Sequence, residues 1–461
     1  MPSRQDQLHS YQFTVQRAVA ALVMRETDPA QSPFRRLAGA GLASVLVAAI
    51  GLGGFALYGL FAGGGSGWRD PGAVIVEKES GARFVYREQK LHPVLNYASA
   101  LLIIGADRPK TVLVSRRAID GVPRGLPLGL ADAPDSLPAK GRLSTAPWTV
   151  CSLPATADRS TPRSALLIGV SPGEGRALGD DAVLLRHPDG GLHLVWHQRR
   201  YPLRDPNRVL AALAATRARA MPAAPALLNS LPAGADLAPL ALPGEGEHST
   251  RVSGARVGDV YLVRNSGGGR QYAVALRDGL AGITELQAGL LLARTGQGEP
   301  EPITLGRFAA LPKLPDLAPT GPAAPPTVPP RLAAPDAAGL CARVGDDGGV
   351  TEVRLGVPLP DLTAAPRTGP APGGGVRADH VVVEPGRGAV VEAVAAPGAS
   401  GGAVSVVTDL GRRYVVADSG VLGMLGYRDV RPLRLPASLV ALVPAGTTLD
   451  PAAARVVATP A

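Results

Sequence analysis

Residues that could perform chemistry are sparse in this sequence and form no complete catalytic motif. The glycine-rich GEGRALG (Gly173–Gly179) follows a strand-like run, as a dinucleotide-binding loop would, but Asp180 and Asp181 come next and would repel a pyrophosphate. We interpret it as a turn, and NSGGGR (Asn265–Arg270) as a hairpin. The sequence has no GxxxxGK[ST], which excludes an ordinary phosphate-loop ATPase, and no GxSxG elbow. No catalytic or cofactor-binding residue is predicted, and enzymatic activity of an unfamiliar type stays open.

Three histidines lie close together in RHPDGGLHLVWH, at positions 187, 193 and 197. On a strand, His193 and His197 would face the same side, which makes a metal site geometrically conceivable. No HExxH motif accompanies them, and paired catalytic carboxylates are missing nearby. We therefore expect hydrogen bonding from these histidines and predict no metal.

The segment that would position the rest of the chain is an uncharged run, Leu37–Ala62, preceded directly by Arg35 and Arg36. As a helix it can cross a bilayer core of about 30 Å, whereas the apolar region of a cleaved signal peptide is only about 7–15 residues long. Flanking cations stay in the cytoplasm. The sequence thus predicts a single-pass anchor with a cytoplasmic N-terminus and an exported C-terminal part.

An amphipathic helix is predicted before the anchor. Apolar residues recur at helical spacing and form one stripe, Tyr11, Val15, Val19 and Leu22. Acidic residues balance the nearby basic charge, which weakens binding to lipid alone. We expect this stripe to dock on a protein partner.

Two cysteines, Cys151 and Cys341, lie in the predicted exported part, where disulfides persist. Their spacing excludes a CxxC redox or zinc motif. A bond between them would close a loop of roughly 190 residues and stabilise the fold by about 5 kcal/mol in the chain-entropy model. The alternative is two buried free thiols.

Composition bounds the exported part. The chain has 461 residues, 57 Gly, 45 Pro and a net charge of +9. Abundant Gly and Pro favour turns and short strands over long helices. The basic residues are spread along the chain and lack the clustered aromatics of a nucleic-acid surface, so no nucleic-acid partner is predicted.

Degenerate repeats organise the exported part. PALLNSLPAGADLAP and PASLVALVPAGTTLDP share a Pro-Ala-Gly-x-x-Leu-x-Pro tail, and LPKLPDLAP and VPRGLPLGL are looser copies. A strand-like run with an aromatic lies upstream of each tail: RFVY, LHLVW, RQYAV and RRYVV. One unit of about 45 residues is too small to bury a core alone, so each must pack on a neighbour.

Runs rich in β-branched residues between the repeats predict a discontinuous central sheet domain. These runs are PWTVCSL, SALLIGV, DAVLLRH, DVYLVR, LCARV, TEVRLGV, DHVVVEP and AVVEAV. A proline-rich linker, Ala318–Pro335, should be extended and semi-rigid. The predicted division is 1–36 (cytosolic helix), 37–62 (transmembrane helix), 63–82 (linker), 83–135 (repeat 1), 136–191 (central part a), 192–245 (repeat 2), 246–269 (central part b), 270–320 (repeat 3), 321–410 (linker and central part c) and 411–461 (repeat 4).

The QLHSYQF…ALVMRETDP opening, the PFRR-led anchor, the widely spaced cysteines and the four repeats resemble the EccB family of actinobacterial type VII (ESX) secretion systems. The resemblance covers essentially the whole chain. It implies an α+β protein: one N-terminal transmembrane helix, then an elongated exported part with a β-rich central domain, four repeat domains and one disulfide, between Cys151 and Cys341. The implied role is a structural subunit that builds a multimeric scaffold in the inner membrane.

The same resemblance implies partners. They are an EccC-like motor ATPase, EccD, EccE and further copies of the chain, and the likeness of the repeats to phage-type wall-binding modules suggests contact with a cell-wall polymer. Some family members carry the name ATPase. For this sequence an ATP cofactor would rest on that resemblance alone, because no residue motif supports it.

Overall fold

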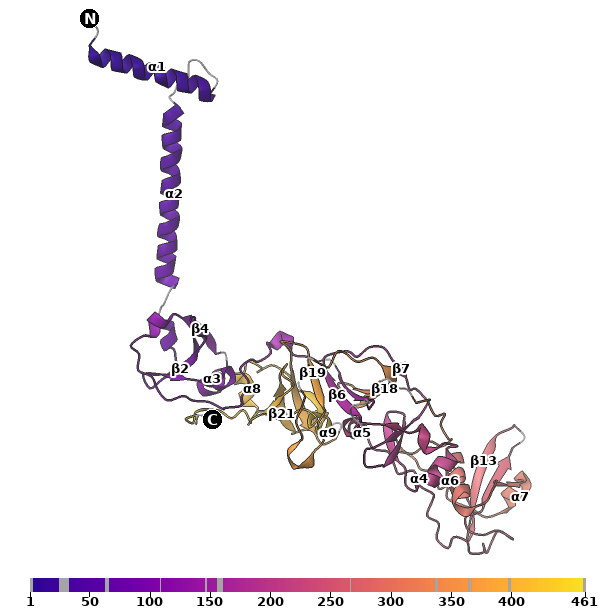
Figure 1. Cartoon of the computed structure of the whole chain (residues 1–461). Coiled ribbons are helices and arrows are strands. Elements are labelled where there is room, and N and C mark those ends of the chain that lie inside the picture. Colours follow the sequence, from indigo (N-terminus) through magenta and orange to yellow (C-terminus); the bar gives the residue numbers. More distant parts are fainter. Residues whose placement is uncertain are drawn as a thin grey trace.

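The computed structural model begins with two helices (Figure 1). They are α1 (Arg4–Met24) and α2 (Pro33–Ala62). Among the described residues, α2 contains the one stretch long and apolar enough to span a bilayer, Ala38–Phe55. The residues described are 3–24, 33–62, 66–107, 109–145, 147–155, 161–265, 267–335, 339–363, 365, 367–396 and 399–458.

Four small sheets after the anchor share one topology. The first strand pairs antiparallel with the second and parallel with the fourth, the third strand lies outside the second, and a helix joins the third strand to the fourth. We call these units repeats 1 to 4. Repeat 1 contains β1 (Ala73–Glu77), β2 (Arg83–Arg87), β3 (Lys90–Pro93), α3 (Tyr97–Ile104) and β4 (Lys110–Val114). Repeat 2 contains β8 (Val183–Arg186), β9 (Leu192–Trp196), β10 (Arg199–Pro202), α4 (Pro206–Ala212), β11 (Met221–Pro222) and α5 (Pro225–Ser230).

The other two repeats add short elements to this plan. Repeat 3 contains β12 (Val260–Arg264), β13 (Arg270–Leu276), β14 (Gly279–Ile283), α6 (Glu285–Thr295), β15 (Glu301–Ile303), α7 (Leu305–Ala310) and β16 (Lys313–Leu314). Repeat 4 contains β20 (Ala389–Val394), β21 (Ala403–Val407), β22 (Arg413–Val415), α8 (Gly420–Met424), β23 (Leu433–Pro436), α9 (Ala437–Val440) and α10 (Pro451–Ala454). Repetition of one strand order makes these four units copies of one supersecondary structure.

Local sequence fixes the limits of the repeat helices. The Asn96 side chain caps α3 by accepting from the Ser99 backbone N–H, and Thr284 forms a capping box with Gln287 at the start of α6. Both helices end at a glycine with left-handed backbone, Gly105 and Gly296. Only glycine adopts that conformation without steric cost, so these two residues stop the helices.

The Pro-Ala-Gly tail has a packing function in the repeats. After each fourth strand the chain returns and runs parallel to the third strand, for example at Arg200 beside Ala233 and at Arg413 beside Ala445. There a glycine lies flat against a ring of the third strand, and an added Cβ would overlap that ring. The three ring and glycine pairs are His92 with Gly125, Tyr201 with Gly234, and Tyr414 with Gly446.

In repeat 3 the large and the small residue of this contact are exchanged between the strand and the tail. The Leu280 backbone N–H donates to the tail carbonyl of Pro312, as its counterparts do in the other repeats. The next residue, however, is Ala281, and the tail carries Leu314 where the other repeats carry glycine. Ala281 and Leu314 pack in one hydrophobic cluster. The large side chain thus comes from the tail and not from the strand, which conserves the packed volume.

A six-stranded central sheet connects the repeats in the order β19-β6-β5-β17-β18-β7. One of its faces, with Trp148, Leu166 and Leu340, packs in a single core with α5 and α9 from repeats 2 and 4. Its strands are β5 (Trp148–Leu153), β6 (Arg163–Ile168), β7 (Arg176–Ala177), β17 (Gly339–Val344), β18 (Val350–Val357) and β19 (His380–Val383).

The chain is an internal duplication around the centre of this sheet. Repeat 1 leads into β5, β6, β7 and repeat 2, and repeat 3 leads into β17, β18, β19 and repeat 4. The repeats then pair across the halves. The helix α3 packs on α8, which joins repeats 1 and 4 in the α2-proximal arm, and α4 packs on α6, which joins repeats 2 and 3 in the distal arm. Figure 1 shows the row of repeat 1, repeat 4, central sheet, repeat 2 and repeat 3.

The strand assignment made from sequence is wrong at three places. DAVLLRH, DVYLVR and AVVEAV form β8, β12 and β20, the first strands of repeat sheets, and not strands of the central sheet. They are largely buried on both faces and rich in Val and Leu, so nothing local distinguishes them from central strands. RRYVV contains the third strand β22 and corresponds to RRYP of β10, whereas the other aromatic runs are second strands.

Candidate functional site: the anchor, the N-terminal helix and the disulfide-linked centre

The predicted N-terminal stripe lies on α1, and three of its four residues are exposed. Tyr11 is 69% exposed and Leu22 83%, Val15 is also exposed, and Val19 is half-buried. Phe13, on another side of the helix, is 62% exposed as well. Apolar side chains in contact with water favour association, so α1 offers a surface that a membrane or a protein could cover.

The predicted flanking cations occupy the start of the membrane helix. Arg35 and Arg36 lie in the first turn of α2, whose following residues are uncharged to its end at Ala62. Residues 25–32, between the two helices, and 63–65, at the start of the predicted linker, lie outside the described part of the chain.

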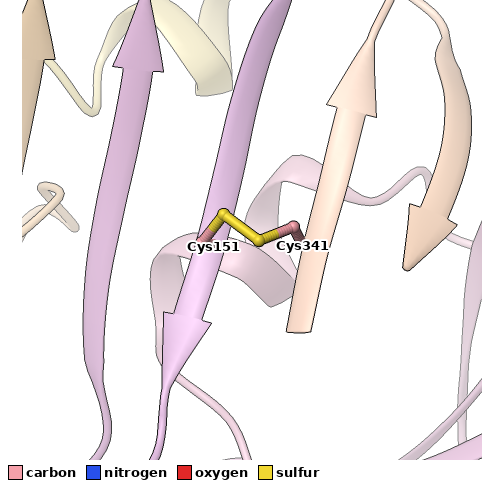
Figure 2. Close-up of a disulfide and its surroundings, with 2 residues drawn as sticks. All are labelled: Cys151 and Cys341. Carbon is pink, nitrogen blue, oxygen red and sulfur yellow. A yellow bond between two sulfur atoms is a disulfide. The ribbon is translucent and has the colours of Figure 1, made fainter. Parts of the chain in front are cut away.

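The two cysteines form a disulfide at the middle of the central sheet (Figure 2). Cys151 of β5 and Cys341 of β17 are direct partners in the antiparallel ladder, with Cα atoms 4.0 Å apart. Both are buried, in a small cluster with Ala165, Leu167 and Val357. The bond joins the two strands that stand at the centre of the duplication, and the distal arm lies between the two cysteines in sequence.

The three clustered histidines do not converge. The strand β9 ends at Trp196, and His197 lies in the following tight turn with a left-handed φ of 43°, so it does not share a face with His193. His197 instead pairs with Asp180 at 2.9 Å, and His187 pairs with Asp189 at 2.8 Å. Within the described residues no group of three His, Cys, Asp or Glu side chains could hold a metal.

The two glycine-rich segments differ in structure. GEGRALG was predicted to be a turn, but it contains the edge strand β7, whose Ala177 pairs with Arg354 of the central sheet, and only its last residue, Gly179, lies in a turn. NSGGGR closes the hairpin of β12 and β13, where Asn265 Oδ1 accepts from the Gly269 N–H. Neither segment opens a helix, which a phosphate-binding loop requires.

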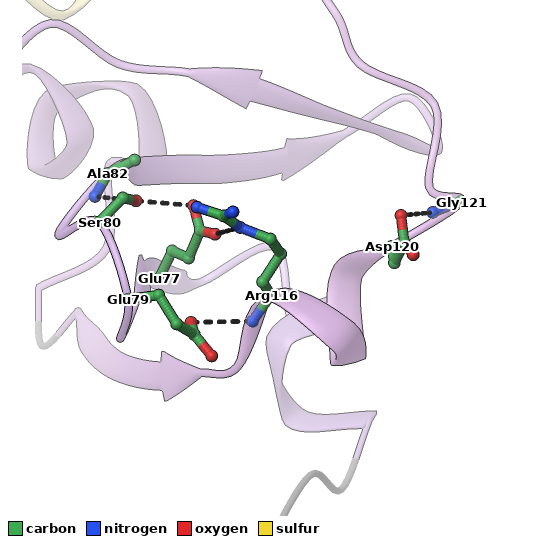
Figure 3. A network of polar contacts seen from close by, with 7 residues as sticks. All are labelled: Glu77, Glu79, Ser80, Ala82, Arg116, Asp120 and Gly121. Atoms are coloured by element: carbon green, nitrogen blue, oxygen red, sulfur yellow. Dashed lines mark hydrogen bonds and ion pairs between the residues drawn. The ribbon is translucent and has the colours of Figure 1, made fainter.

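A polar network that the sequence did not reveal ties repeat 1 together (Figure 3). Arg116 Nε donates to Glu77 Oε1 at 2.6 Å, and Ser80 Oγ donates to Glu77 Oε2 at 2.7 Å. The Arg116 backbone N–H also donates to Glu79. The bonds from Arg116 and Ser80 hold the pKa of the Glu77 carboxyl below its ordinary value. Arg116 and Glu77 are 39 residues apart, beyond any local pattern.

A second such network fixes the proline-rich linker on the distal arm. Asp181, in the loop before β8, accepts two bonds from Arg331 at 2.8 and 2.9 Å and one from Arg176 at 2.9 Å. The hydrogen bond from Arg176 lowers the pKa of the Asp181 carboxyl; burial opposes this, and Arg331 adds to it. The linker continues beside Ala182 and accepts a bond from the Tyr201 hydroxyl at Ala324 O, 3.0 Å away. It packs along repeat 2 and contains a turn at Gly321, so it is not extended throughout.

These elements define a class: a protein with one candidate membrane helix and an elongated, duplicated β-repeat part. Residues 1–460 match the family model described as "Type VII secretion system ESX-1, transport TM domain B". The chain belongs to this family, EccB, of the type VII (ESX) secretion systems. With the span found in α2, it is a single-pass protein of the inner membrane.

Similar proteins come from several ESX systems. The "ESX-3 secretion system ATPase EccB3" of Mycolicibacterium smegmatis is 29% identical over 476 residues, which cover 96% of this chain and 88% of that protein. The "ESX-5 secretion system ATPase EccB5" of Mycobacterium marinum is 32% identical over a stretch that covers 68% of this chain and 63% of the relative. The "ESX-2 secretion system ATPase EccB2" of Mycobacterium tuberculosis is 34% identical, over 50% of this chain and 47% of the relative.

Solved structures agree in fold. A chain of an intact ESX-5 inner membrane complex superposes with a TM-score of 0.67 at 27% identity, covering 100% of this chain and 96% of that chain. An EccB3 dimer from the ESX-3 core complex gives a TM-score of 0.65 at 27% identity, covering 83% of this chain and 100% of that one. Proteins similar to this chain thus occur as subunits of ESX membrane complexes and as a dimer.

Proposed function

We propose that this protein is a structural subunit of a type VII secretion membrane complex, in which the repeats and central sheet form an exported, multimeric scaffold. The observation that carries the proposal is the match over the whole chain, anchor included, to proteins solved within ESX inner membrane complexes. Purification of the native complex tests it: the chain should co-purify in fixed ratio with an EccC-like motor ATPase, EccD and EccE. Complexes that assemble fully without this chain would contradict the proposal.

The proposed orientation has the N-terminus in the cytoplasm and the repeats outside. Arg35 and Arg36 at the start of α2 support it through the positive-inside rule. Protease added to intact spheroplasts should degrade the part after Trp68 and spare α1. Protection of the repeats and loss of α1 would reverse the assignment.

The exposed stripe on α1 docks on a protein partner in the same complex. Tyr11→Asp and Val15→Asp place charges in an apolar contact and should release the chain from the purified complex while leaving it in the membrane fraction. Gln16→Asp, on another side of the helix, is the matched control and should co-purify normally. Equal loss with the control would assign the effect to charge alone.

Two further roles attach to the family name and to the repeats. The relatives are named ATPases, but the phosphate-loop motif is missing from this sequence, so we do not extend hydrolysis to this chain. Phosphate release by the purified full chain that survives removal of contaminants would revise this.

Contact of the exported repeats with a cell-wall polymer is tested by co-sedimentation with isolated walls at low salt.

A further inference from the structure

The disulfide face of the central sheet differs from the opposite face because no helix of the described chain packs on it. Its residues form a row in register across four strands: Cys341, Cys151, Ala165 and His380. The short segment after β18 covers part of it, through Leu359 and Leu362. At the edge of that cover lies a depression of about 570 Å³.

Basic side chains line this depression. Arg163 begins β6, and Arg367 bridges the first residue of β19, His380. No ion pair or hydrogen bond engages either guanidinium within the described residues. An arginine presents five donors in a planar fork, so two unpaired ones in a single depression form a site suited to oxygen anions.

The carboxylates nearby form no ion pair with these arginines among the described residues. Asp379 accepts from the backbone N–H and the hydroxyl of Ser164, each at 2.7 Å. Asp361 accepts from the backbone N–H and hydroxyl of Thr363, at 2.9 and 2.8 Å. Both acids are therefore engaged by their own neighbours, and the donors of the two guanidiniums stay available to a ligand.

His380 adds a buried group without a partner. It is 3% exposed and lines the depression, and its Nε2 has no hydrogen-bond partner among the described residues. Its Nδ1 lies 3.4 Å from the Ala365 carbonyl, which can only accept, so Nδ1 carries a proton and the neutral ring presents a lone pair at Nε2. A buried polar atom without a partner costs free energy that a ligand could recover.

We propose that Arg163, Arg367 and His380 form a binding site for an oxyanion, a carboxylate or phosphate group that carries an apolar substituent. The arginines bind the anion, and the apolar wall of Leu153, Leu359 and Leu362 receives the substituent. No relative's name and no step of the scaffold function assigns this site. It stands independently of the assembly role.

Proton uptake accompanies binding of a carboxylate. In the free protein, burial lowers the pKa of His380, Arg163 and Arg367 lower it further, and the Ala365 carbonyl and Asp379 oppose them. The ring is therefore neutral near pH 7. An anion beside Nε2 raises that pKa and favours the imidazolium, which then donates to the anion. Affinity for carboxylates should thus increase as the pH falls.

Calorimetric titration of the full chain in detergent tests the proposal, with sodium hexanoate, acetate and inorganic phosphate as probes at constant ionic strength. We expect saturable binding that weakens roughly tenfold in Arg163→Gln and in Arg367→Gln, because each change removes a charge-assisted hydrogen bond. Arg343→Gln is the matched control: Arg343 is an exposed arginine on the same face, in the neighbouring depression. It should bind like the wild type.

The outcomes separate the ligand sources. Tighter binding of hexanoate than of acetate or phosphate assigns a carboxylate with an apolar chain, and tighter binding of phosphate assigns a lipid or wall-polymer phosphate. Titration of hexanoate in two buffers of different ionisation enthalpy should show proton uptake that His380→Gln abolishes. Absence of saturable binding for all three probes, or equal weakening by Arg343→Gln, overturns the proposal.

Discussion

The two arms of the molecule contain the same repeat fold and are assembled differently. In the distal arm, repeats 2 and 3 follow each other in sequence, within residues 183–333. In the α2-proximal arm, repeat 1 pairs with repeat 4, and Leu143 lies beside Gly388 across the whole intervening chain. The entropic cost of closing a loop rises with its length, so the proximal pairing is the more costly one to form. Equal local packing therefore does not make the arms equally stable.

In each arm, one strap joins the outer repeat to the inner one. The chain leaving repeat 1 lies across repeat 4, where the Tyr427 hydroxyl donates to Pro138 O at 2.6 Å. The chain leaving repeat 3 lies across repeat 2, where the Tyr201 hydroxyl donates to Ala324 O at 3.0 Å. Both straps then reach the residue before the first strand of the inner repeat, Gly388 or Ala182. The arms can thus be compared through matched substitutions.

The largest expected effect comes from the disulfide, because it closes a long loop. Of the two arms, only the distal one lies within that loop. Its sequence separation is 190 residues, and Cys151→Ser should lower the free energy of unfolding by about 5 kcal/mol in the chain-entropy model. Chemical denaturation of the full chain under oxidising conditions measures this. Wild type with a reductant should match the variant, and hydrogen exchange should rise first in residues 183–333. A loss that persists when both proteins are reduced would indicate packing and not loop closure.

The next effect tests the glycine and ring pairs in both arms. Gly234→Ala and Gly446→Ala each place a Cβ into a tyrosine ring, and overpacking of this kind costs about 1–3 kcal/mol. Thermal unfolding should show similar losses for the two variants. Gly306→Ala is the control, because an added Cβ there meets open space. A loss confined to one arm would show that the other arm unfolds outside the measured transition.

A smaller effect is expected from the strap hydroxyls. Tyr427→Phe and Tyr201→Phe each remove one hydrogen bond to a carbonyl, worth about 1 kcal/mol. Both rings are fully buried, but the Tyr427 bond is the shorter, at 2.6 Å against 3.0 Å, so the Tyr427 variant should lose more. Denaturation midpoints of the two variants provide the comparison. Equal losses would contradict the ranking.

The smallest effect is pH dependence of the distal strap. The pKa of Asp181 in the folded protein lies below its ordinary value of 3.8, chiefly through the bond from Arg176. The stability that ionised Asp181 gives to the folded protein is therefore complete above pH 3.8. It is lost as the pH falls through the lower pKa of the folded state. Hydrogen exchange of repeat 2 should accelerate in that range in wild type and be insensitive to it in Asp181→Asn. Asp132→Asn, in the proximal strap, should leave that acid response of repeat 2 unchanged.

Sequence patterns predicted the parts of this fold that depend on local chemistry. The tails were visible because a ring requires a glycine beside it, and Tyr201 and Tyr414 occur in the same RRY context. The anchor followed from an uncharged run of sufficient length.

Features that combine distant segments were out of reach. The first strands of the repeats have the same composition as strands of the central sheet. Which sheet a strand joins is therefore decided by the strands it pairs with and not by its composition. The proposed oxyanion site joins Arg163, Arg367 and His380, which lie in three separate segments that carry no binding motif of their own. The Asp181 network likewise spans 150 residues.

The pairing of repeat 1 with repeat 4 sets an order for biosynthesis. Repeat 1 leaves the ribosome first, yet the α8 surface that covers α3 belongs to a segment that begins at Ala389, 246 positions after Leu143. Until then Leu101 and Leu102 of α3 lack their partner from that helix. A stalled or truncated product would expose this apolar surface next to the membrane, where quality-control proteases could recognise it. The arm nearest the anchor is thus completely packed only after repeat 4 has been synthesised.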